Sequence, residues 1–580
     1  MKNHILKTVA IICCLALCAG ILLSCKSKEA EENLYPSDNP EDYPATISIP
    51  AQEADENGEI SFSYSIPENV RTGYDKFAVK IYHDDRNNNL LATAEINGSG
   101  QNGTVAAAYG KIKLYIVGTK GDGQEEIIAV NKTTVWADEY NFASLNGTFP
   151  VVYFTLGLFS MDGESKANFE AANVEAGKNI QFIKNVPTFA SLERVAAYNW
   201  NSLPKNVHTL PNVSYDYSIS GDFHGTNNAM ADYIAELYEI NPESKFHFYC
   251  VDNYPELIAK FFYAQGIGDD SFDATFISDG TATVAAFKRI FSESDADEKY
   301  ETLAAEWQAV KEKAAAGQQN YFEGLTHGYE DYSILMDYAF VMANEQSNIK
   351  WWISRDLFTA NSGTQEIADK IALMKSNDEG GDKIEIFGIN DMLSNLSAAD
   401  QVNLKELFHF DGEMFSAAEE NGKKILVIIG TSTAGEENIE QYLDLIKTLY
   451  GDEYQIYYKG HPGYLTGLNA QKLAMFEKYG ITDIDGSIAA ELILFYCPDV
   501  YLAGWSSTTY KSASTDRLLA LFNETAETGL EKAQTDGYSD IPDSFYSFDA
   551  ESGYVKIEYA NGSPAKYYNA TTNTIVDQLP

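Results

Sequence analysis

Beyond Gly147 the chain alternates between two kinds of segment, and this alternation limits its possible folds more than any other feature. Short apolar runs such as PVVYFTLGLF, FHFYCV and DATFIS have the length and composition of buried β-strands. Longer runs between them, such as NNAMADYIAELYEI and YPELIAKFFYAQ, show helical spacing. Strands that alternate with helices form parallel sheets covered on both faces. The sequence therefore predicts an α/β fold after Gly147.

A second alternating block follows a mostly helical stretch from Ser292 to about Ala343. It contains the runs KKILVIIG, ENIEQYLDLIKTLY, YQIYYKG, IAAELILFY and DVYLAGW. We expect two Rossmann-like domains, at 146–390 and 391–560, followed by a C-terminal tail at 561–580. Ligands of open α/β sheets bind beyond the carboxyl ends of the strands. Two such domains facing each other would form a cleft, the GT-B arrangement of many glycosyltransferases, although a fold alone does not establish that activity.

Ahead of these domains, about seven short alternating segments lie between Ala45 and Phe142. Gly- and Asn-rich turns such as NGSGQNG separate them. This pattern predicts an all-β sandwich of immunoglobulin type at 46–145. The segment has no pair of cysteines and no cluster of catalytic residue types, so a spacer or binding module is expected there.

The N-terminus has the features of an export signal. Lys2 and Lys7 precede an apolar core from Val9 to Leu23, and the run LLSC ends at Cys25. The run resembles the lipobox of bacterial lipoproteins, which predicts a signal peptide at 1–25, a lipid on Cys25 and a charged linker at 26–45. The alternative is an uncleaved anchor, but the apolar stretch is shorter than the about 20 residues of a typical span. We therefore expect a lipid-anchored lipoprotein of the bacterial cell envelope, in the outer membrane.

Charge and cysteine content narrow the possible ligands. The formal net charge is -44, from 85 acidic and 41 basic residues, which argues against a nucleic-acid partner. An anionic ligand would need a locally positive pocket. Once the signal is removed, Cys250 and Cys497 remain besides Cys25, too few for a disulfide scaffold or a cysteine-based metal site. Both lie in apolar runs and are expected to be buried thiols.

Polar residues follow the predicted strands of the second block. The clusters are Gly430-Thr431-Ser432-Thr433, Lys459-Gly460-His461-Pro462, Glu491 early in a helix, and Ser506-Ser507. Each has an ordinary structural explanation: a serine often caps a helix, and an early glutamate favours the helix dipole. Together, however, they lie at one edge of one predicted sheet, where hydroxyl and backbone N–H groups can hold a phosphate.

The first block offers Asp279-Gly280, in the run FISDGTA after a predicted strand. Asp and Gly are common turn residues, so an ordinary turn is the alternative. If the two domains face each other, Asp279 and His461 lie on opposite walls of the cleft, an arrangement suited to acid–base chemistry on a bound group.

These residues resemble, in order, the motifs of a known family: the bacterial sialyltransferases of glycosyltransferase family 80, found in Pasteurella and Photobacterium. Ser278-Asp279-Gly280 matches its Asp/Glu-Asp-Gly, Gly430 to Thr433 its Gly-Thr-Thr-Thr, and Lys459 to Pro462 is identical to its Lys-Gly-His-Pro. Glu491 and the pair Ser506-Ser507 also match, as does the segment Leu396 to Phe415. The resemblance covers about residues 147–560.

The resemblance implies an inverting, metal-independent transfer of sialic acid from CMP-sialic acid to a glycan hydroxyl, with no cofactor. Asp279 would be the general base, and His461 would bind the donor phosphate and protonate the departing CMP. The remaining donor-side roles would fall to Glu491 on the ribose, Ser506 and Ser507 on the phosphate, and Lys459 with Gly430 to Thr433 around the nucleotide.

The departures from the family lie mainly on the acceptor side. Ala434 stands where the family has a tryptophan, Asn253 where it has a histidine, and Ser278 where it has an acidic residue. A basic residue of the family is also missing around His224 to Thr226. These changes predict an acceptor other than a plain lactose-like disaccharide, or a related nonulosonic acid as donor. Two alternatives stay open: a catalytically degenerate glycan-binding lipoprotein, and a GT-B transferase that uses another nucleotide sugar.

Overall fold

The computed structural model divides the chain into two compact units, residues 1–84 with 90–135, and residues 85–89 with 136–580. The described residues are 36–145 without 56, 85–89 and 107–109; 179–183; 207–210; 225–277 without 253–254; 286; 290; 295–325; 332–353; 384–386; 393–394; 398–431 without 408–409; 438–460; 470–485; 488; 490–536 without 514–515; 538; and 540–579. The predicted strand PVVYFTLGLF lies outside these ranges.

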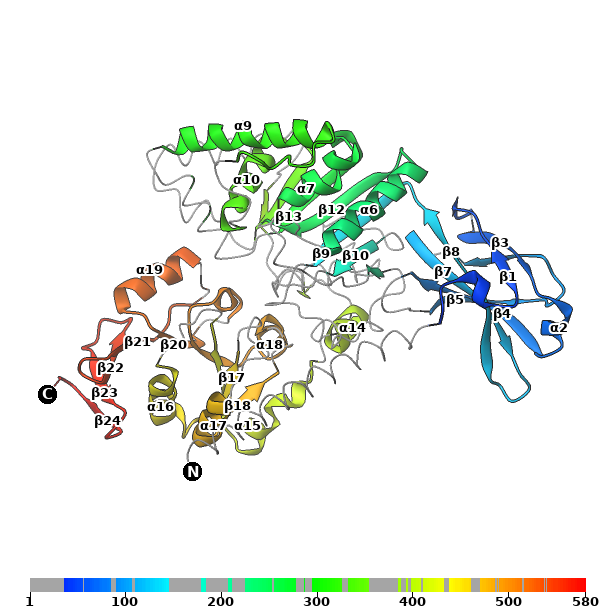
Figure 1. Cartoon of the computed structure of the whole chain (residues 1–580). Helices are drawn as coiled ribbons and strands as arrows, with labels where there is room; N and C mark the ends of the chain where they lie inside the picture. Colours follow the sequence, from blue (N-terminus) through cyan, green and yellow to red (C-terminus); the bar gives the residue numbers. More distant parts are fainter. Residues whose placement is uncertain are drawn as a thin grey trace, which may run out of the picture. The chain divides into compact units, whose positions relative to one another are not determined.

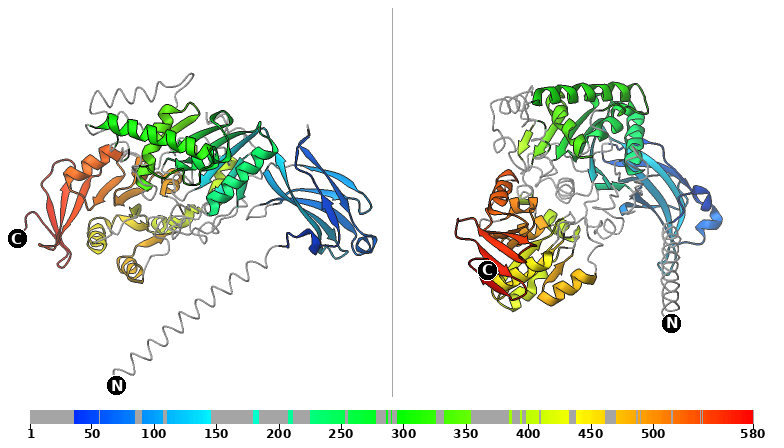
Figure 2. Two further views of the ribbon diagram at one scale, coloured as in Figure 1. Left: turned by 45° about the horizontal axis from the view of Figure 1, so that its top comes forward. Right: turned by 60° about the vertical axis from the view of Figure 1, so that its left-hand side comes forward.

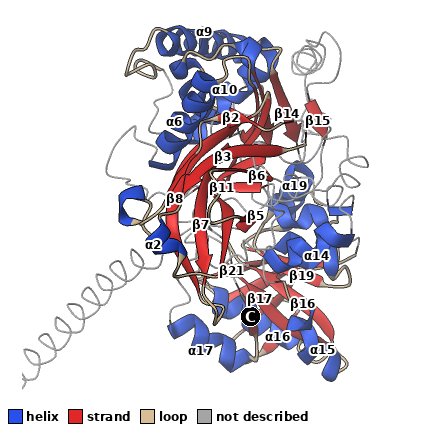
Figure 3. Ribbon diagram, turned by 90° about the vertical axis from the view of Figure 1, so that its right-hand side faces the viewer, coloured by secondary structure: helices blue, strands red, loops and turns tan. Residues whose placement is uncertain are grey.

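The first unit is built from two antiparallel sheets (Figure 1). One has the order β1 (Thr46–Ser48), β3 (Glu59–Ser65) and β6 (Asn102–Ala106). The other has the order β2 (Gln52–Glu53), β8 (Glu125–Trp136), β7 (Gly110–Thr119), β4 (Lys76–His83) and β5 (Leu90–Ile96). The short helices η1 (Pro40–Asp42) and α2 (Glu68–Arg71) complete the unit. Figure 3 shows the long strands β7 and β8.

Alternation along the strands explains this arrangement. In β3 every second side chain is buried, and Ile60 and Phe62 share one apolar core with Val79 and Leu114 of the other sheet. Two sheets with a common core form the predicted β-sandwich; its immunoglobulin type stays a prediction. The end of the predicted linker packs on this unit, because Ala45 is buried and Asp38 forms ion pairs with Lys113 (2.8 Å) and Lys132 (2.7 Å).

The second unit contains a seven-stranded sheet in which all neighbouring strands are parallel. The order is β11 (Val207–Leu210), β10 (Asn179–Ile183), β9 (Glu139–Leu145), β12 (Lys245–Val251), β13 (Phe272–Ile277), β14 (Ile349–Ile353) and β15 (Ile384–Ile386). Counted along the chain, this is 3-2-1-4-5-6-7, the doubly wound order of dinucleotide-binding folds with one added strand. Its helices are α6 (Gly225–Ile240), α7 (Glu256–Phe261), η3 (Tyr263–Gln265), η4 (Asp269–Ser271), α9 (Ala296–Ala315) and α10 (Tyr332–Glu345).

The boundary predicted at residue 145 is wrong by several residues. The predicted bounds include EYNFASL in the sandwich, but this segment forms β9, near the centre of the parallel sheet. There it lies between β10 and β12, with Phe142 fully buried. The sandwich therefore ends at about Trp136.

A nine-stranded sheet forms the rest of the second unit. Its order is β18 (Thr482–Ile484), β17 (Tyr454–Lys459), β16 (Lys424–Ile429), β19 (Tyr501–Gly504), β20 (Leu518–Phe522), β21 (Ser544–Asp549), β22 (Tyr554–Tyr559), β23 (Lys566–Asn569) and β24 (Thr574–Val576). The first six repeat the parallel order 3-2-1-4-5-6. The helices are α14 (Ala398–Leu407), η5 (Gly412–Phe415), α15 (Ser416–Glu420), α16 (Ile439–Tyr450), α17 (Ala470–Tyr479), α18 (Ala490–Tyr496), η7 (Thr508–Ser512) and α19 (Ala526–Asp536).

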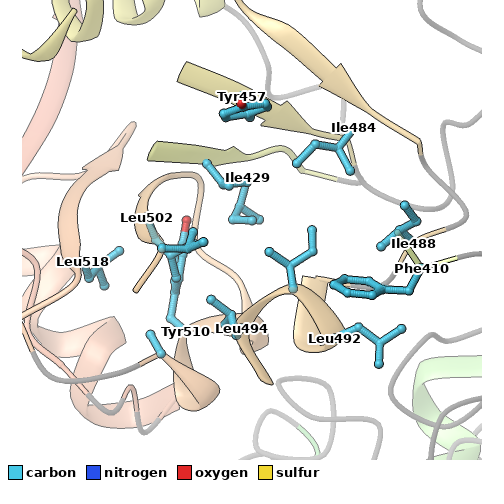
Figure 4. Packing of buried hydrophobic residues seen from close by; sticks show 14 of the residues in the cluster. Phe410, Ile429, Tyr457, Ile484, Ile488, Leu492, Leu494, Leu502, Tyr510 and Leu518 are labelled. Atoms are coloured by element: carbon cyan, nitrogen blue, oxygen red, sulfur yellow. The ribbon is translucent and has the colours of Figure 1, made fainter. Parts of the chain in front are cut away.

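This sheet is apolar on both faces, as the continuous run KKILVIIG predicts. Val427 and Ile429 of β16 pack in one cluster with Leu492 and Leu494 of α18 (Figure 4). The alternate residues Leu426 and Ile428 pack in another cluster, with residues of α16 and α17. Helices therefore cover both sides of the parallel strands.

The predicted tail at 561–580 is also wrong, because two strands of this sheet, β23 and β24, lie within it. Strands β22, β23 and β24 pair antiparallel in succession, starting from β21. They extend the sheet at its C-terminal end, drawn red in Figure 2. Tyr568 of β23 is fully buried and packs in one cluster with residues of α16, which holds the segment against the rest of the sheet.

Candidate nucleotide-binding edge of the second parallel sheet

Four strand ends of the nine-stranded sheet lie in one row. The strand register pairs Ile484 with Lys459, Lys459 with Ile429, and Ile429 with Gly504. Because all four strands are parallel, the residues that follow these ends emerge at the same edge. The structure thus brings together Gly430, Gly460 and Trp505, with Thr431 and Ser506 next in sequence, as the sequence predicted.

This edge includes the topological switch point of the sheet. From β16 the chain proceeds outward through β17 and β18, and it then returns to place β19 on the other side of β16. The strands that follow β16 and β19 in the chain thus lie on opposite sides of this point, and ligands of open α/β sheets bind at such a switch point. The predicted residues Gly430, Thr431, Ser506 and Ser507 follow these two strands.

The two central strand ends approach each other closely. Trp505 N donates to Ile429 O at 3.0 Å, and Gly430 N donates to Lys459 O at 2.9 Å. Gly504 has φ +129°, and a Cβ atom there would lie 2.2 Å from Ile429 O. Only glycine fits this position, since both its backbone conformation and its surroundings exclude a side chain.

A small group of charged residues lies at this edge. Lys459 is only 3% exposed, and its Nζ donates to Gly460 O at 2.8 Å. Glu491, 6% exposed, lies in the first turn of α18, and Lys459 attracts its carboxylate. Lys459 attracts Asp483 as well. Desolvation raises the pKa of Asp483 to about 6, and its attraction to Lys459 offsets only part of that shift.

Burial is also the main influence on Glu491. It raises the pKa of this carboxyl group above the ordinary value, while a hydrogen bond from Thr509 and the attraction to Lys459 and Lys511 lower it in part. Glu491 was predicted as a ribose-binding residue. A carboxylate that the fold buries at a net cost is more typical of a functional group than of a stabilising one.

Hydroxyl groups connect Glu491 to the loop after β19. Thr509 Oγ1 donates to Glu491 Oε1 at 3.1 Å, and Ser507 Oγ donates to Thr509 Oγ1 at 3.1 Å. Thr509 N in turn donates to Ser507 Oγ at 3.3 Å. Sequence reasoning missed Thr509, although the hydroxyl run Ser-Ser-Thr-Thr was a signal for such a network.

Ser507 caps the helix that follows, as the ordinary structural explanation of a serine at this position predicts. That helix, η7, is a five-residue 3₁₀ segment, shorter than the helix expected there. The free dipole of a long helix is therefore not available at this point, and an anion would depend on individual N–H and O–H donors.

Tyr538, from the segment after α19, supplies another contact that sequence reasoning missed. Its hydroxyl accepts from Ser507 N at 3.2 Å and forms a short hydrogen bond with Ser506 Oγ. Its ring meets Tyr510 edge to face, with ring centroids 5.2 Å apart. No spacing in the sequence indicated that Tyr538 would reach the loop after β19.

The edge formed by the carboxyl ends of the strands in the seven-stranded sheet lies only partly within the described residues. Its switch point lies between β9 and β12. Asp252, directly after β12, is fully buried; its N donates to Ile277 O at 3.1 Å and its Oδ2 accepts from Trp351 Nε1 at 3.2 Å. Cys250 of β12 is buried as expected, whereas Cys497 is half-buried.

Several predicted residues lie outside the described ranges: Cys25, Asn253, Asp279, Gly280, Ser432, Thr433, Ala434, His461 and Pro462. Their placement stays a prediction. Within the described ranges, no group of three His, Cys, Asp or Glu residues is arranged to hold a metal ion. No helix in that same part of the chain has the length and apolarity to cross a membrane.

The raised pKa of Glu491 gives a pH-dependent prediction. The ionised carboxylate costs stability above the folded-state pKa, and this cost declines as the pH falls toward the ordinary glutamate value of about 4.3. Glu491→Gln is therefore expected to raise the unfolding midpoint by about 2 °C or more at pH 8.0, and by less at pH 5.0. Thermal unfolding at both pH values measures this, with the exposed Glu477→Gln of α17 as control. A lower midpoint for Glu491→Gln at pH 8.0 would contradict the argument.

Comparison with known proteins gave structural similarities alone. No protein-family model matches the chain, and no curated protein matches its sequence. A solved sialyltransferase from Photobacterium damsela is 14% identical, with 84% of this chain and 95% of that chain covered and a TM-score of 0.48. A 2,6-sialyltransferase from Photobacterium sp. JT-ISH-224, solved with CMP and lactose, is 12% identical, with 85% and 93% covered and a TM-score of 0.49.

An α/β-galactoside α-2,3-sialyltransferase from Photobacterium phosphoreum is 11% identical, with 69% of this chain and 96% of that chain covered and a TM-score of 0.47. The similar structures thus include three sialyltransferases from Photobacterium.

Proposed function

We propose that this protein is a sialyltransferase-like glycosyltransferase, which moves sialic acid from CMP-sialic acid to a glycan hydroxyl with inversion. One observation carries the proposal. Motif segments scattered from Gly430 to Ser507 meet at one strand edge, at the switch point where this type of sheet binds ligands. Packing alone does not require the polar segments at Gly430, Lys459 and Ser506 to share that edge.

The donor nucleotide would bind across this edge. Glu491, held by Thr509, would accept hydrogen bonds from the ribose hydroxyls. Lys459, Gly460 and the Gly430–Thr433 segment would surround the nucleotide, and Ser506 with Ser507 N would face its phosphate. The overall charge of -44 repels anions, so a lysine at this point supplies the local positive charge that a nucleotide needs.

For the chemical step we propose a GT-B cleft, in which the carboxyl ends of the two parallel sheets face each other. Asp279 would take the proton from the acceptor hydroxyl while the oxygen of that hydroxyl attacks the anomeric carbon of the sialic acid. The bond from that carbon to the phosphate oxygen breaks, and His461 gives a proton to the departing phosphate. N–H, O–H and imidazolium donors stabilise the negative charge that grows there. The proposal assigns no metal and no other cofactor to this step.

The acceptor and the location are further parts of the proposal. Because the departures from the family motifs lie at Asn253, Ser278 and Ala434, we propose an acceptor other than a plain lactose-like disaccharide, or a related nonulosonic acid as donor. A lipid on Cys25 would hold the protein at the outer membrane of the cell envelope.

Nucleotide binding tests the proposal directly. Titration with CMP, UDP and GDP should give saturable binding for CMP alone, and incubation with CMP-sialic acid and mixed glycans should release CMP. A response to UDP or GDP instead would favour a transferase with another donor. Glycan binding without any nucleotide response would favour a degenerate binding lipoprotein.

A further inference from the structure

The hydroxyl of Tyr538 contacts the loop after β19. The amide of Ser507 and the hydroxyl of Ser506 are among the groups of this loop that could donate to an anion. Tyr538 engages both, since it accepts from Ser507 N at 3.2 Å and is hydrogen-bonded to Ser506 Oγ.

The third group in the loop, the hydroxyl of Ser507, has a separate role. It accepts from Thr509 N and donates to Thr509 Oγ1, which continues to Glu491. The hydrogen atom of this hydroxyl is thus committed to the Thr509 network. An incoming phosphate that binds at Ser507 therefore has to take its amide, which donates to Tyr538.

An amide has one hydrogen, so a phosphate oxygen and the tyrosine hydroxyl cannot both take a good hydrogen bond from Ser507 N. We propose that Tyr538 is an internal substitute for the ligand: its hydroxyl fills the anion position when the site is empty and withdraws when phosphate binds. This inference rests on the proposed function, which gives the same loop to the phosphate of the donor.

The arrangement has a use at the end of the reaction. When CMP begins to leave, the hydroxyl of Tyr538 can again accept from Ser507 N and pair with Ser506 Oγ, so neither group is left unsatisfied in a partly buried loop. Tyr538 then lowers the affinity for the product and speeds its release, a step that limits turnover in many enzymes.

The decisive experiment compares Tyr538→Phe with the intact protein. The variant keeps the ring that packs against Tyr510 and loses the competing hydroxyl. CMP should bind about five-fold more tightly to the variant. A typical hydrogen bond contributes about 1 kcal/mol, and about 1.4 kcal/mol changes an affinity tenfold. Cytidine, which has no phosphate, should bind both proteins equally. CMP should also become a stronger product inhibitor.

Tyr442→Phe is the matched control. The hydroxyl of Tyr442 likewise accepts from a backbone amide, Phe548 N at 3.2 Å, and contacts a side chain, Asn523, but it belongs to the cluster on the other face of the sheet. Loss of this hydroxyl should lower stability and leave CMP affinity unchanged.

The outcomes separate this inference from the proposed function. If the intact protein binds CMP and Tyr538→Phe binds it equally or more weakly, the substitute role is wrong and the proposed function stands. If neither protein binds any nucleotide, the proposed function fails, and inorganic phosphate becomes the probe. Tighter phosphate binding by Tyr538→Phe would still support the inference, whereas no difference would overturn it.

Discussion

Gly504→Ala is expected to destabilise the protein by about 2–4 kcal/mol and to abolish nucleotide binding. The added Cβ would lie 2.2 Å from Ile429 O, in a backbone conformation, φ +129°, that alanine rarely adopts. Relief of this contact requires β16 and β19 to separate at their carboxyl ends, where the hydrogen bond from Trp505 N to Ile429 O joins them. Denaturant unfolding and CMP titration measure the two effects.

Gly422→Ala is the control for backbone strain alone. Gly422 also has a positive φ, +63°, but a Cβ there would meet nothing within 4 Å. Its substitution should cost about 1 kcal/mol and leave CMP binding intact. Similar losses of stability for the two variants would show that close approach of the strands is not the reason for Gly504.

The second large effect concerns the proposed chemistry. Asp279→Asn should lower the rate of CMP release in the presence of acceptor by about 10²–10⁴-fold, because asparagine cannot take the proton from the acceptor hydroxyl. Its affinity for CMP should stay the same, since Asp279 is assigned to the acceptor. His461→Ala should lower the rate by a similar factor and also weaken CMP binding, because this residue is assigned to the phosphate.

Asp273→Asn is the control and should retain full activity. Asp273 is an exposed carboxylate on β13, the strand that ends shortly before Asp279 in the sequence. Initial rates with saturating donor, together with CMP titrations, distinguish the two roles. Full activity of Asp279→Asn would remove the proposed general base, and an unchanged CMP affinity of His461→Ala would remove the assigned phosphate contact.

Much of this architecture is predictable because burial imposes simple patterns. The run EISFSYS alternates because its strand has one buried face, and β3 confirms this. The run KILVII is continuously apolar because both faces of its strand are buried, and β16 confirms this. Parallel strands then bring the polar residues at their carboxyl ends to one edge without any further information. The positions of Gly430, Lys459 and Ser506 along one edge were predictable for that reason.

Other features depend on contacts between distant segments, and local patterns do not encode them. The run EYNFASL alternates like a sandwich strand, yet its partners β10 and β12 place it inside a parallel sheet. Residues after 560 are polar and turn-rich, and it is the pairing of β23 with β22 and the burial of Tyr568 that place them in the sheet. Tyr538 is 32 residues from Ser506 in sequence, so neither periodicity nor spacing indicates their contact.

The antiparallel strands added after β21 have a consequence for solubility. Both outer strands of the nine-stranded sheet, β18 and β24, have only three residues, so few unpaired backbone groups face other molecules. Without residues 561–579, the six-residue strand β22 (YVKIEY) would become the edge strand of the sheet. Its unpaired backbone groups could then pair with the same strand of a second molecule. The last strands thus protect against self-association while they take no part in the proposed chemistry.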